Sequence, residues 1–342
     1  MGRTAFAPGL AFALVLALAF GPARAGECRR TVPDATGQPV CIPARIERIV
    51  ITCYGGAVQE IAVLKGGDRI VAQPGVDRFP QFARMYPRLG SLPDVGSFDN
   101  VNLESLLATR PDMVFASFFS PAANDKIRAL GIPVFTLGTG RQDIRTILEE
   151  FEHVGALLGE EGKARELVAY WRERLTTIRN RTVGVETPKR VLYLGGSGGT
   201  ENRLGWGDAF IVAAGGVNVA HDLESRGAVS AEQIRLWNPD VIVTSTNEGS
   251  RTAAASIRTG AAYRQVKAVA GGQVHAAPIG GFWWDRPSPE AILGILWLSK
   301  MLYPDLMRDV NLEQETHAFF SRFYGYALSG EEYRRFFQQA AR

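Results

Sequence analysis

The sequence predicts an α/β protein of two similar lobes, each built on a mainly parallel sheet and bridged by one long α-helix. Short, wholly apolar segments alternate with helical patterns in both halves, which is typical of parallel sheets covered on both faces. Between the halves, residues 143–181 repeat apolar side chains at three-and-four spacing. The halves also resemble each other, because Asn102-Leu-Glu with Arg110-Pro-Asp is matched by Ala231-Glu-Gln with Asn238-Pro-Asp.

The first 25 residues are typical of a secretory signal peptide. Arg3 precedes an apolar run at 10–20, and Ala23-Arg24-Ala25 resembles a cleavage site. The residues before Cys28 do not resemble a lipoprotein box, so we expect a free soluble protein. Arg3 and Arg24 are two of the 38 basic residues, and the remaining 36 face 35 acidic residues. A near-neutral balance gives no reason to expect a nucleic acid or an anionic membrane surface as partner.

Three cysteines in an oxidising compartment suggest one disulfide and one leftover thiol. Cys28 and Cys41 flank a turn sequence at 34–37, with β-type residues on both sides. Across such a hairpin the two side chains lie within disulfide reach. Cys53 is then unpaired, and it is either buried at a strand end or faces a ligand.

The first lobe is expected over residues 26–141. Its predicted strands are 49–52, 70–72, 113–116 and 133–137, and its predicted helices are 58–64, 102–107 and 125–130. Residues 77–86 are rich in aromatic and basic side chains and are predicted to form a loop.

The bridge is expected over 142–184, with Gly159 and Gly162 as places where it could kink. The second lobe is expected over 185–342 and ends in a helical tail. Its predicted strands are 191–194, 241–244 and 274–279, and its predicted helices are 208–214, one starting at Ser230, 263–269 and one following Ser288.

The stretch 280–304 is the most informative part of the chain. Ser288 is a plausible helix N-cap, Pro289 suits the first helical position, and Glu290 suits the positive end of the helix dipole. A strand therefore leads through an aromatic and basic loop to a helix start, where open α/β sheets usually bind ligands. The alternative is a tryptophan pair buried in the lobe core, with Arg286 in a surface ion pair.

The predicted strand-to-helix loops combine aromatic rings with arginines. Such a set suits a large, flat, anionic ligand, through stacking and charge-assisted hydrogen bonds. The candidate ligand-binding residues are Tyr54, Arg78, Phe98, Arg203, Trp206, Arg226, Trp283, Trp284 and Arg286.

The sequence offers little for catalysis or for a bare metal ion. The glycine run at 195–199 lacks the spacing of a phosphate loop, and no two of the four histidines stand at metal-ligand spacing. We therefore expect no metal site, no cofactor and no enzyme activity. An enzyme that uses Asp285 or His221 as acid–base group is the alternative of a different class.

From about residue 30 to 305 the chain resembles periplasmic solute-binding proteins of the ferric-siderophore, haem and cobalamin class, which serve ABC importers. The matching motifs are the hairpin at 31–43, Arg48-Ile-Val, Val95-Gly-Ser, Arg110-Pro-Asp-Met-Val, Ala214-Gly-Gly-Val-Asn-Val, Trp284-Asp-Arg-Pro-Ser-Pro and Leu296-Trp-Leu-Ser-Lys-Met-Leu-Tyr-Pro.

The resemblance implies two lobes joined by a rigid helix, with a ligand held between them. It also implies that Glu104 and Glu232, one per lobe, dock onto arginines of a membrane permease; a solvated first-turn carboxylate is the alternative role. The expected ligand is an iron-siderophore, haem or cobalamin, and a molybdate or tungstate oxyanion is the alternative. The resemblance also implies a monomer whose partners are an ABC permease with its ATPase and an outer-membrane receptor system. A sensor that presents its loaded form to a receptor is the alternative role.

Overall fold

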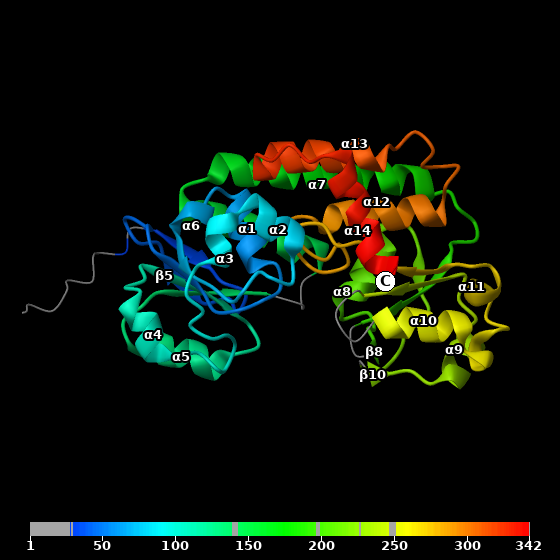
Figure 1. Cartoon of the computed structure of the whole chain (residues 1–342), viewed down its shortest axis with the longest axis horizontal. Helices are drawn as coiled ribbons and strands as arrows, with labels where there is room; N and C mark the ends of the chain where they lie inside the picture. The colour runs from blue at the N-terminus through cyan, green and yellow to red at the C-terminus, as the bar shows by residue number, and fades with distance from the viewer. Residues whose placement is uncertain are drawn as a thin grey trace, which may run out of the picture.

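The fold is described from a computed structural model, which describes residues 28, 30–138, 143–195, 199–225, 227–245 and 251–341. Two lobes stand side by side, each with a four-stranded parallel sheet, and the helices α7, α12 and α13 run along one side of the molecule (Figure 1). The predicted signal peptide and Arg226 lie outside the described residues.

The N-terminal lobe has the strand order β4-β3-β5-β6, with every pairing parallel. Its strands are β3 (Ile49–Ile51), β4 (Ile70–Ala72), β5 (Met113–Ser117) and β6 (Val134–Leu137). Its helices are α1 (Ala57–Val63), η1 (Gly67–Arg69), α2 (Pro80–Met85), α3 (Pro87–Gly90), α4 (Leu103–Ala108) and α5 (Pro121–Ala129). All residues of β3, β5 and β6 are buried, which explains why these strands are apolar throughout.

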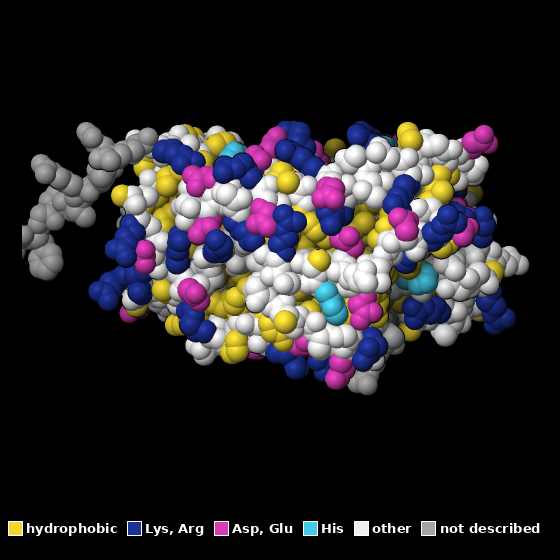
Figure 2. All heavy atoms as spheres, turned by 90° about the horizontal axis from the view of Figure 1, so that it is seen from above, with side chains coloured by type: hydrophobic (Ala, Val, Ile, Leu, Met, Phe, Trp, Pro, Cys, Tyr) yellow, Lys and Arg dark blue, Asp and Glu magenta, His cyan; other side chains and the backbone are white. Residues whose placement is uncertain are grey.

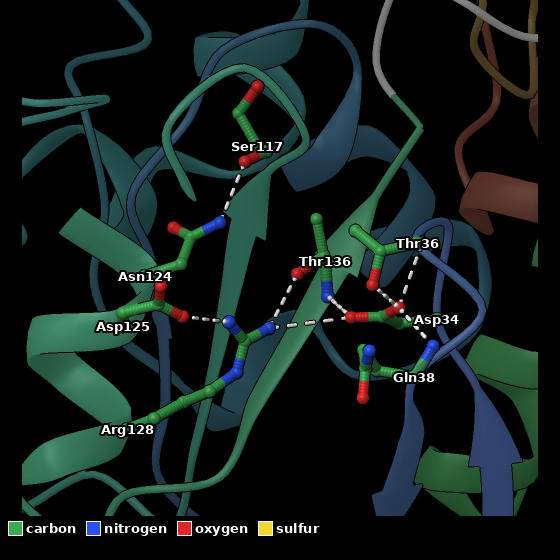
Figure 3. A network of polar contacts seen from close by, with 8 residues as sticks. All are labelled: Asp34, Thr36, Gln38, Ser117, Asn124, Asp125, Arg128 and Thr136. Carbon is green, nitrogen blue, oxygen red and sulfur yellow. Dashed lines mark hydrogen bonds and ion pairs between the residues drawn. The ribbon is translucent and has the colours of Figure 1, made fainter. Parts of the chain in front are cut away.

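The predicted hairpin is present as β1 (Thr31–Pro33) and β2 (Pro39–Cys41), which pair antiparallel. Cys28 and Cys41 form the predicted disulfide, with their Cα atoms 5.6 Å apart. Asp34 anchors the turn to the lobe (Figure 3): one carboxylate oxygen accepts hydrogen bonds from the turn, and the other contacts Arg128 at 3.4 Å and the Thr136 amide at 3.3 Å.

The predicted 142–184 helix is in fact two helices, α6 (Ile144–Leu158) and α7 (Glu161–Thr182). The break is at Gly159, whose φ of 71° is left-handed and ends α6. Helix α6 packs against β1 in the N-terminal lobe, while α7 also contacts α8 and α12 of the other lobe. The bridge is therefore α7 alone, about 33 Å long at 1.5 Å per residue.

The C-terminal lobe has the strand order β12-β11-β7-β9, again parallel throughout. Its strands are β7 (Arg190–Leu194), β9 (Val217–Asn218), β11 (Val241–Thr244) and β12 (Val274–Ala276), with a small antiparallel pair, β8 (Gly199–Thr200) and β10 (Gly227–Ala228). Its helices are α8 (Trp206–Ala213), α9 (Ala231–Trp237), α10 (Arg251–Thr259), η2 (Ala261–Tyr263), α11 (Lys267–Ala270) and α12 (Ala291–Leu302).

The helical tail consists of α13 (Leu312–Phe319), the π-helical turn η3 (Phe320–Tyr324) and α14 (Gly330–Ala341). It lies along α7 and reaches back to the N-terminal lobe, where α1 contacts η3. Seen from this side, Lys and Arg side chains alternate with Asp and Glu (Figure 2). Arg174 with Glu315, at 3.1 Å, is one of the pairs that join α7 to the tail.

Two local predictions were wrong. Residues 80–85 form α2 inside the predicted loop, because Pro80 occupies the first helical turn and Phe82 packs into the core. The predicted helix at 263–269 is replaced by η2 and α11, while α10 precedes them at 251–259. Helix α10 buries Ala254 and Ile257. Two apolar positions form too narrow an apolar face to give a recognisable helical pattern in the sequence.

Candidate functional site

Three predicted ligand-binding residues lie together at the carboxyl ends of the N-terminal strands. Tyr54 follows β3, and the Arg78 guanidinium, in the segment after β4, lies 4.4 Å from the centre of the Tyr54 ring. The Phe98 ring is 6.0 Å from Tyr54 on another side. Tyr54 and Phe98 are half-buried and Arg78 is exposed, so the group presents two rings and a cation at the surface.

Phe98 is held in an unusual backbone conformation. Its φ of 54° is left-handed, a region that bulky side chains rarely adopt, and its amide donates a 2.8 Å hydrogen bond to the Thr52 carbonyl just beyond β3. Strained residues of this kind are found preferentially at functional sites. The surrounding fold thus fixes the Phe98 ring beside Tyr54 at some energetic cost.

The loop between β12 and α12 brings the opposite lobe to this group. The Phe79 ring, next to Arg78, lies 4.8 Å from Trp283 and 4.9 Å from Phe282, centre to centre. On α1, the Gln59 side-chain amide donates a 3.1 Å hydrogen bond to the Gly281 carbonyl. Trp283 is half-buried. Residues from both lobes therefore meet at Phe79 and Gln59.

Arg286 has polar neighbours in the C-terminal lobe. Its guanidinium is 26% exposed, donates a 3.3 Å hydrogen bond to the Ser245 hydroxyl beyond β11, and lies 3.9 Å from Asp285. The Asp285 carboxylate already accepts a 2.8 Å hydrogen bond from the Tyr193 hydroxyl. Burial raises the pKa of Tyr193, so this hydroxyl stays protonated as a donor.

The Arg286 guanidinium lies near acidic groups, but at 3.9 Å its contact with Asp285 is long. The Tyr193 oxygen, and after it the Asp285 carboxylate, raise the pKa of Arg286, so the guanidinium remains charged at any ordinary pH. Its contact with Asp285 is nevertheless longer than a hydrogen bond. A cation in this state favours an approaching anion. The sequence analysis did not identify Tyr193 and Ser245, because the sequence of a strand does not reveal which loop its side chains contact.

Glu290 supports the loop from beneath. Its side chain is fully buried and accepts hydrogen bonds from the Tyr324 hydroxyl at 2.7 Å, the Gly281 amide at 3.0 Å and the Trp284 indole at 3.1 Å. Burial raises the pKa of Glu290 to about 7, although these donors act to lower it. The prediction of Ser288 as N-cap was wrong: α12 begins at Ala291, after Glu290.

Two predicted ligand-binding tryptophans are core residues. Trp284 is 0% exposed, and its ring packs edge-on against Phe336 at 6.0 Å; Trp206 is 1% exposed at the start of α8. Neither ring reaches a surface that a ligand can touch, so the alternative of a buried ring holds for Trp284. Tryptophan in the sequence signals burial and ligand stacking equally, and tertiary packing decides between them.

Arg203 is exposed on the segment before α8, and Arg226 lies outside the described residues. Cys53 is fully buried, and burial raises the pKa of its thiol, so it is a core residue rather than a ligand-facing nucleophile. The two acid–base candidates are engaged separately, Asp285 with Tyr193 and His221 with Asp208 at 2.9 Å.

The two predicted docking glutamates occupy equivalent positions. Glu104 lies in the first turn of α4 and Glu232 in the first turn of α9, and both are exposed. Helices α4 and α9 lie on the side of the molecule opposite α7 (Figure 1).

Within the described ranges, no group of three or more His, Cys, Asp or Glu is arranged to hold a metal ion. No helix in the part of the chain that the structure describes combines the length and the apolar character needed to cross a membrane.

Two similar parallel-sheet lobes, a helical bridge and facing loops rich in rings and arginines define the class of two-lobed binding proteins. Residues 50–278, about two thirds of the chain, match the periplasmic binding protein family. The chain therefore belongs to this family, and the resemblance inferred from its motifs is confirmed.

Individual relatives agree with this assignment. The molybdate-binding protein MolA of Haemophilus influenzae is 25% identical over 332 aligned positions, covering 86% of this chain and 91% of that protein. A cobalamin-binding protein of Halobacterium salinarum is 28% identical over 271 positions, covering 77% and 71%. The crystal structure of a periplasmic solute-binding protein from Veillonella parvula superposes with a TM-score of 0.76 at 26% identity, covering 90% of this chain and 97% of that one. By name, each of these three relatives is a binding protein.

Proposed function

We propose that this protein captures a metal chelate with anionic groups, such as an iron-siderophore, haem or cobalamin, and delivers it to the permease of an ABC importer. The observation that carries the proposal is the contact between the two lobes, where Phe79, next to Arg78, packs against Phe282 and Trp283. The group of Tyr54, Arg78 and Phe98 lies on one side of this contact in the chain, and Arg286 follows Trp283 on the other. The rings would stack on the organic part of the chelate, and the guanidinium groups would bind its acidic groups.

A molybdate or tungstate oxyanion is the second candidate. The relative MolA, matched over 91% of its length, favours it, and so does the guanidinium of Arg286, which lies 3.9 Å from Asp285 and is partly exposed. A compact oxyanion would use the Arg286 guanidinium and the Ser245 hydroxyl and would leave the rings of Tyr54 and Phe98 without a role. The aromatic group therefore favours the chelate.

The remaining parts of the proposal follow from the family. The protein would reach the periplasm through cleavage of the predicted signal peptide, as a free monomer without enzymatic activity. Its partners would be the permease with its ATPase and, where the chelate is large, an outer-membrane receptor system. Capture would involve only a small closure, because a single stiff helix resists wide hinge bending.

The double variant Trp283→Ala with Arg286→Ala tests the binding site. Calorimetric titration with ferric chelates, haem, cobalamin and molybdate first identifies the ligand that the wild type binds. The affinity of the double variant for that ligand should fall by about tenfold or more, because a ring contact and a charged contact are both lost. Arg172→Ala on α7 is the matched control and should bind normally. Unchanged affinity in the double variant would remove both residues from the site.

The ligand class follows from elemental analysis and mass spectrometry of the protein as purified. Iron or cobalt with an organic chelator supports the first candidate, whereas molybdenum or tungsten without one supports the second. Conversion of a bound chelate to a product would contradict a pure binding role.

A further inference from the structure

The imidazole of His221 is held by a carboxylate through one of its two nitrogens. Its Nδ1 lies 2.9 Å from Oδ1 of Asp208, in the first turn of α8. An ionised carboxylate can only accept, so Nδ1 carries the hydrogen and Nε2 keeps its lone pair. The His221 side chain is 47% exposed, whereas that of Asp208 is 10% exposed. The ring therefore has its donor nitrogen directed away from the buried carboxylate.

The backbone around this ring is fixed on both sides. The His221 amide donates a 3.2 Å hydrogen bond to the Asn218 carbonyl, and the His221 carbonyl accepts one of 3.2 Å from the Arg203 amide. The buried Asn218 side chain donates to Oδ1 of Asp208 at 3.0 Å and to the Glu201 carbonyl at 2.8 Å. A carboxylate on the second nitrogen, itself hydrogen-bonded, is the arrangement by which proteins orient a histidine toward a metal ion.

This ring lies at the carboxyl end of the C-terminal sheet. Strand β9 runs parallel to β7, and His221 follows β9 by three residues. Ser245, which contacts Arg286, follows β11 at the same edge. Helix α8 packs on Tyr193, since a Cβ at Gly207 would lie 2.6 Å from its ring, and α8 lies nearer to the N-terminal lobe than α9 and α11 do (Figure 1). His221 and Arg286 are therefore at the same end of one sheet.

The surface beside His221 combines a cation with an apolar side chain. Arg203, whose amide holds the His221 carbonyl, is exposed, and the adjacent Leu204 is 72% exposed. A metal chelate with an organic face and acidic groups can use a donor to its metal, an apolar contact and a cation. These three neighbouring residues supply one of each, which gives the predicted ligand-binding residue Arg203 a place in the site.

We propose that His221 ligates the metal of the bound chelate through Nε2, and that the ligand is an iron chelate with an exchangeable coordination position, such as haem. The lone pair of Nε2 replaces a water on the iron, the water is released, and the iron keeps its oxidation state. Asp208 acts as a positioning residue. Within the described residues no group of three metal-binding side chains exists, and none is needed, because the chelate supplies the other donors.

The inference rests on the proposed function and deepens it. A hexadentate siderophore fills all six positions on ferric iron and leaves none for an imidazole, whereas a porphyrin leaves its axial positions open. His221 therefore separates two kinds of ligand that stacking rings and guanidinium groups alone do not distinguish.

The test is a titration with haemin and with ferric desferrioxamine B, a saturated chelate, followed by absorption and electron paramagnetic resonance. The wild type should bind haemin with the spectrum of nitrogen-ligated ferric haem. His221→Ala should lose that spectrum and bind about tenfold or more weakly, and added free imidazole should restore the spectrum. Asp208→Asn should keep the spectrum but weaken binding by about tenfold, because the ring loses its charged partner. His153→Ala, at a half-buried histidine on α6, is the matched control and should behave as the wild type does.

The outcomes separate this inference from the proposed function. A nitrogen-ligated spectrum that persists in His221→Ala, or disappears in His153→Ala, would overturn the assignment of His221. Wild-type binding of ferric desferrioxamine B but not of haemin would overturn the inference and leave the proposed function intact. Binding of molybdate alone, or of no chelate at all, would overturn the proposed function and the inference with it.

Discussion

Glu290 carries an ionisable group into the interior, at the point where the two lobes and the tail converge. Its oxygens leave no room for side chains on the adjacent backbone, because a Cβ at Gly280 or Gly281 would lie within 2.6 Å of the carboxylate. Through Gly281 the carboxylate is linked to Gln59 of the N-terminal lobe, and through Tyr324 to the tail. One residue thus fixes the base of the loop that carries Trp283 and Arg286.

This burial predicts a pH-dependent stability. The folded pKa of Glu290 is about 7, above the ordinary value of 4.5, so its contribution is fully present below about pH 4.5 and is lost as pH rises through 7. The loss is on the order of 3 kcal/mol. Glu290→Gln keeps the shape but cannot ionise. We therefore expect the difference in Tm, variant minus wild type, to become more positive between pH 5 and pH 8 in scanning calorimetry.

Glu332→Gln is the control for this experiment. Burial acts to raise the pKa of Glu332, but hydrogen bonds from Ser329 and Tyr326 lower it to about 2. Its stabilisation is present above about pH 4.5 and is lost only as pH falls toward 2. The Tm difference for Glu332→Gln should therefore stay constant between pH 5 and pH 8. The same constancy for Glu290→Gln would contradict a raised pKa.

At the scale of single elements, the N-caps of α4 and α9 fix the first helical turns that carry Glu104 and Glu232. Asn102→Ala should lower the free energy of unfolding by about 1 kcal/mol, because the Ser105 amide loses its acceptor. Ser120→Ala is the matched control: Ser120 stands at the N-cap of α5 but makes no side-chain cap bond. Urea unfolding at constant m-value measures both. Equal effects would mean that the cap bond contributes nothing.

Much of this element structure could be predicted from sequence, and the failures share a cause. The strands Ile70–Ala72 and Val241–Thr244 match their predictions, since a short apolar run between turn residues has few alternatives. The break at Gly159 was harder to place because α6 and α7 both continue the apolar spacing. The burial of Trp284 and Glu290 depends on Phe336 and Tyr324, far away in the tail, which no local pattern reveals.

Considered as a whole, the molecule is more tightly joined than two lobes on one helix would be. A single cluster of buried hydrophobic residues extends from Ile49 in one sheet through Phe282 in the loop to Val243 in the other sheet. Phe79 and Gln59 contact the loop directly. These contacts add to the stiffness of α7, so they support a small closure and a single cooperative unfolding transition.

Gly56 is where this junction is most sensitive. Its φ is 91°, and a Cβ there would lie 2.8 Å from the Pro287 carbonyl oxygen and 3.0 Å from the Ser288 side chain, both in the loop from the other lobe. Gly37 in the β1–β2 turn has a similar φ of 80°, but a Cβ added there would have no atom within 4 Å. Alanine at either position costs about 1–2 kcal/mol in backbone strain, but only Gly56→Ala adds a clash, typically of about 1–3 kcal/mol.

Scanning calorimetry of Gly37→Ala and Gly56→Ala separates the cost of backbone strain from the cost of the clash. We expect Gly37→Ala to lower Tm modestly with one sharp transition, and Gly56→Ala to lower it further. A broadened or divided transition in the Gly56 variant would follow if the clash separates the loop from α1, since each lobe would then unfold more independently. Equal Tm losses and equal widths would show that the loop does not bear on Gly56, and would leave α7 as the main restraint between the lobes.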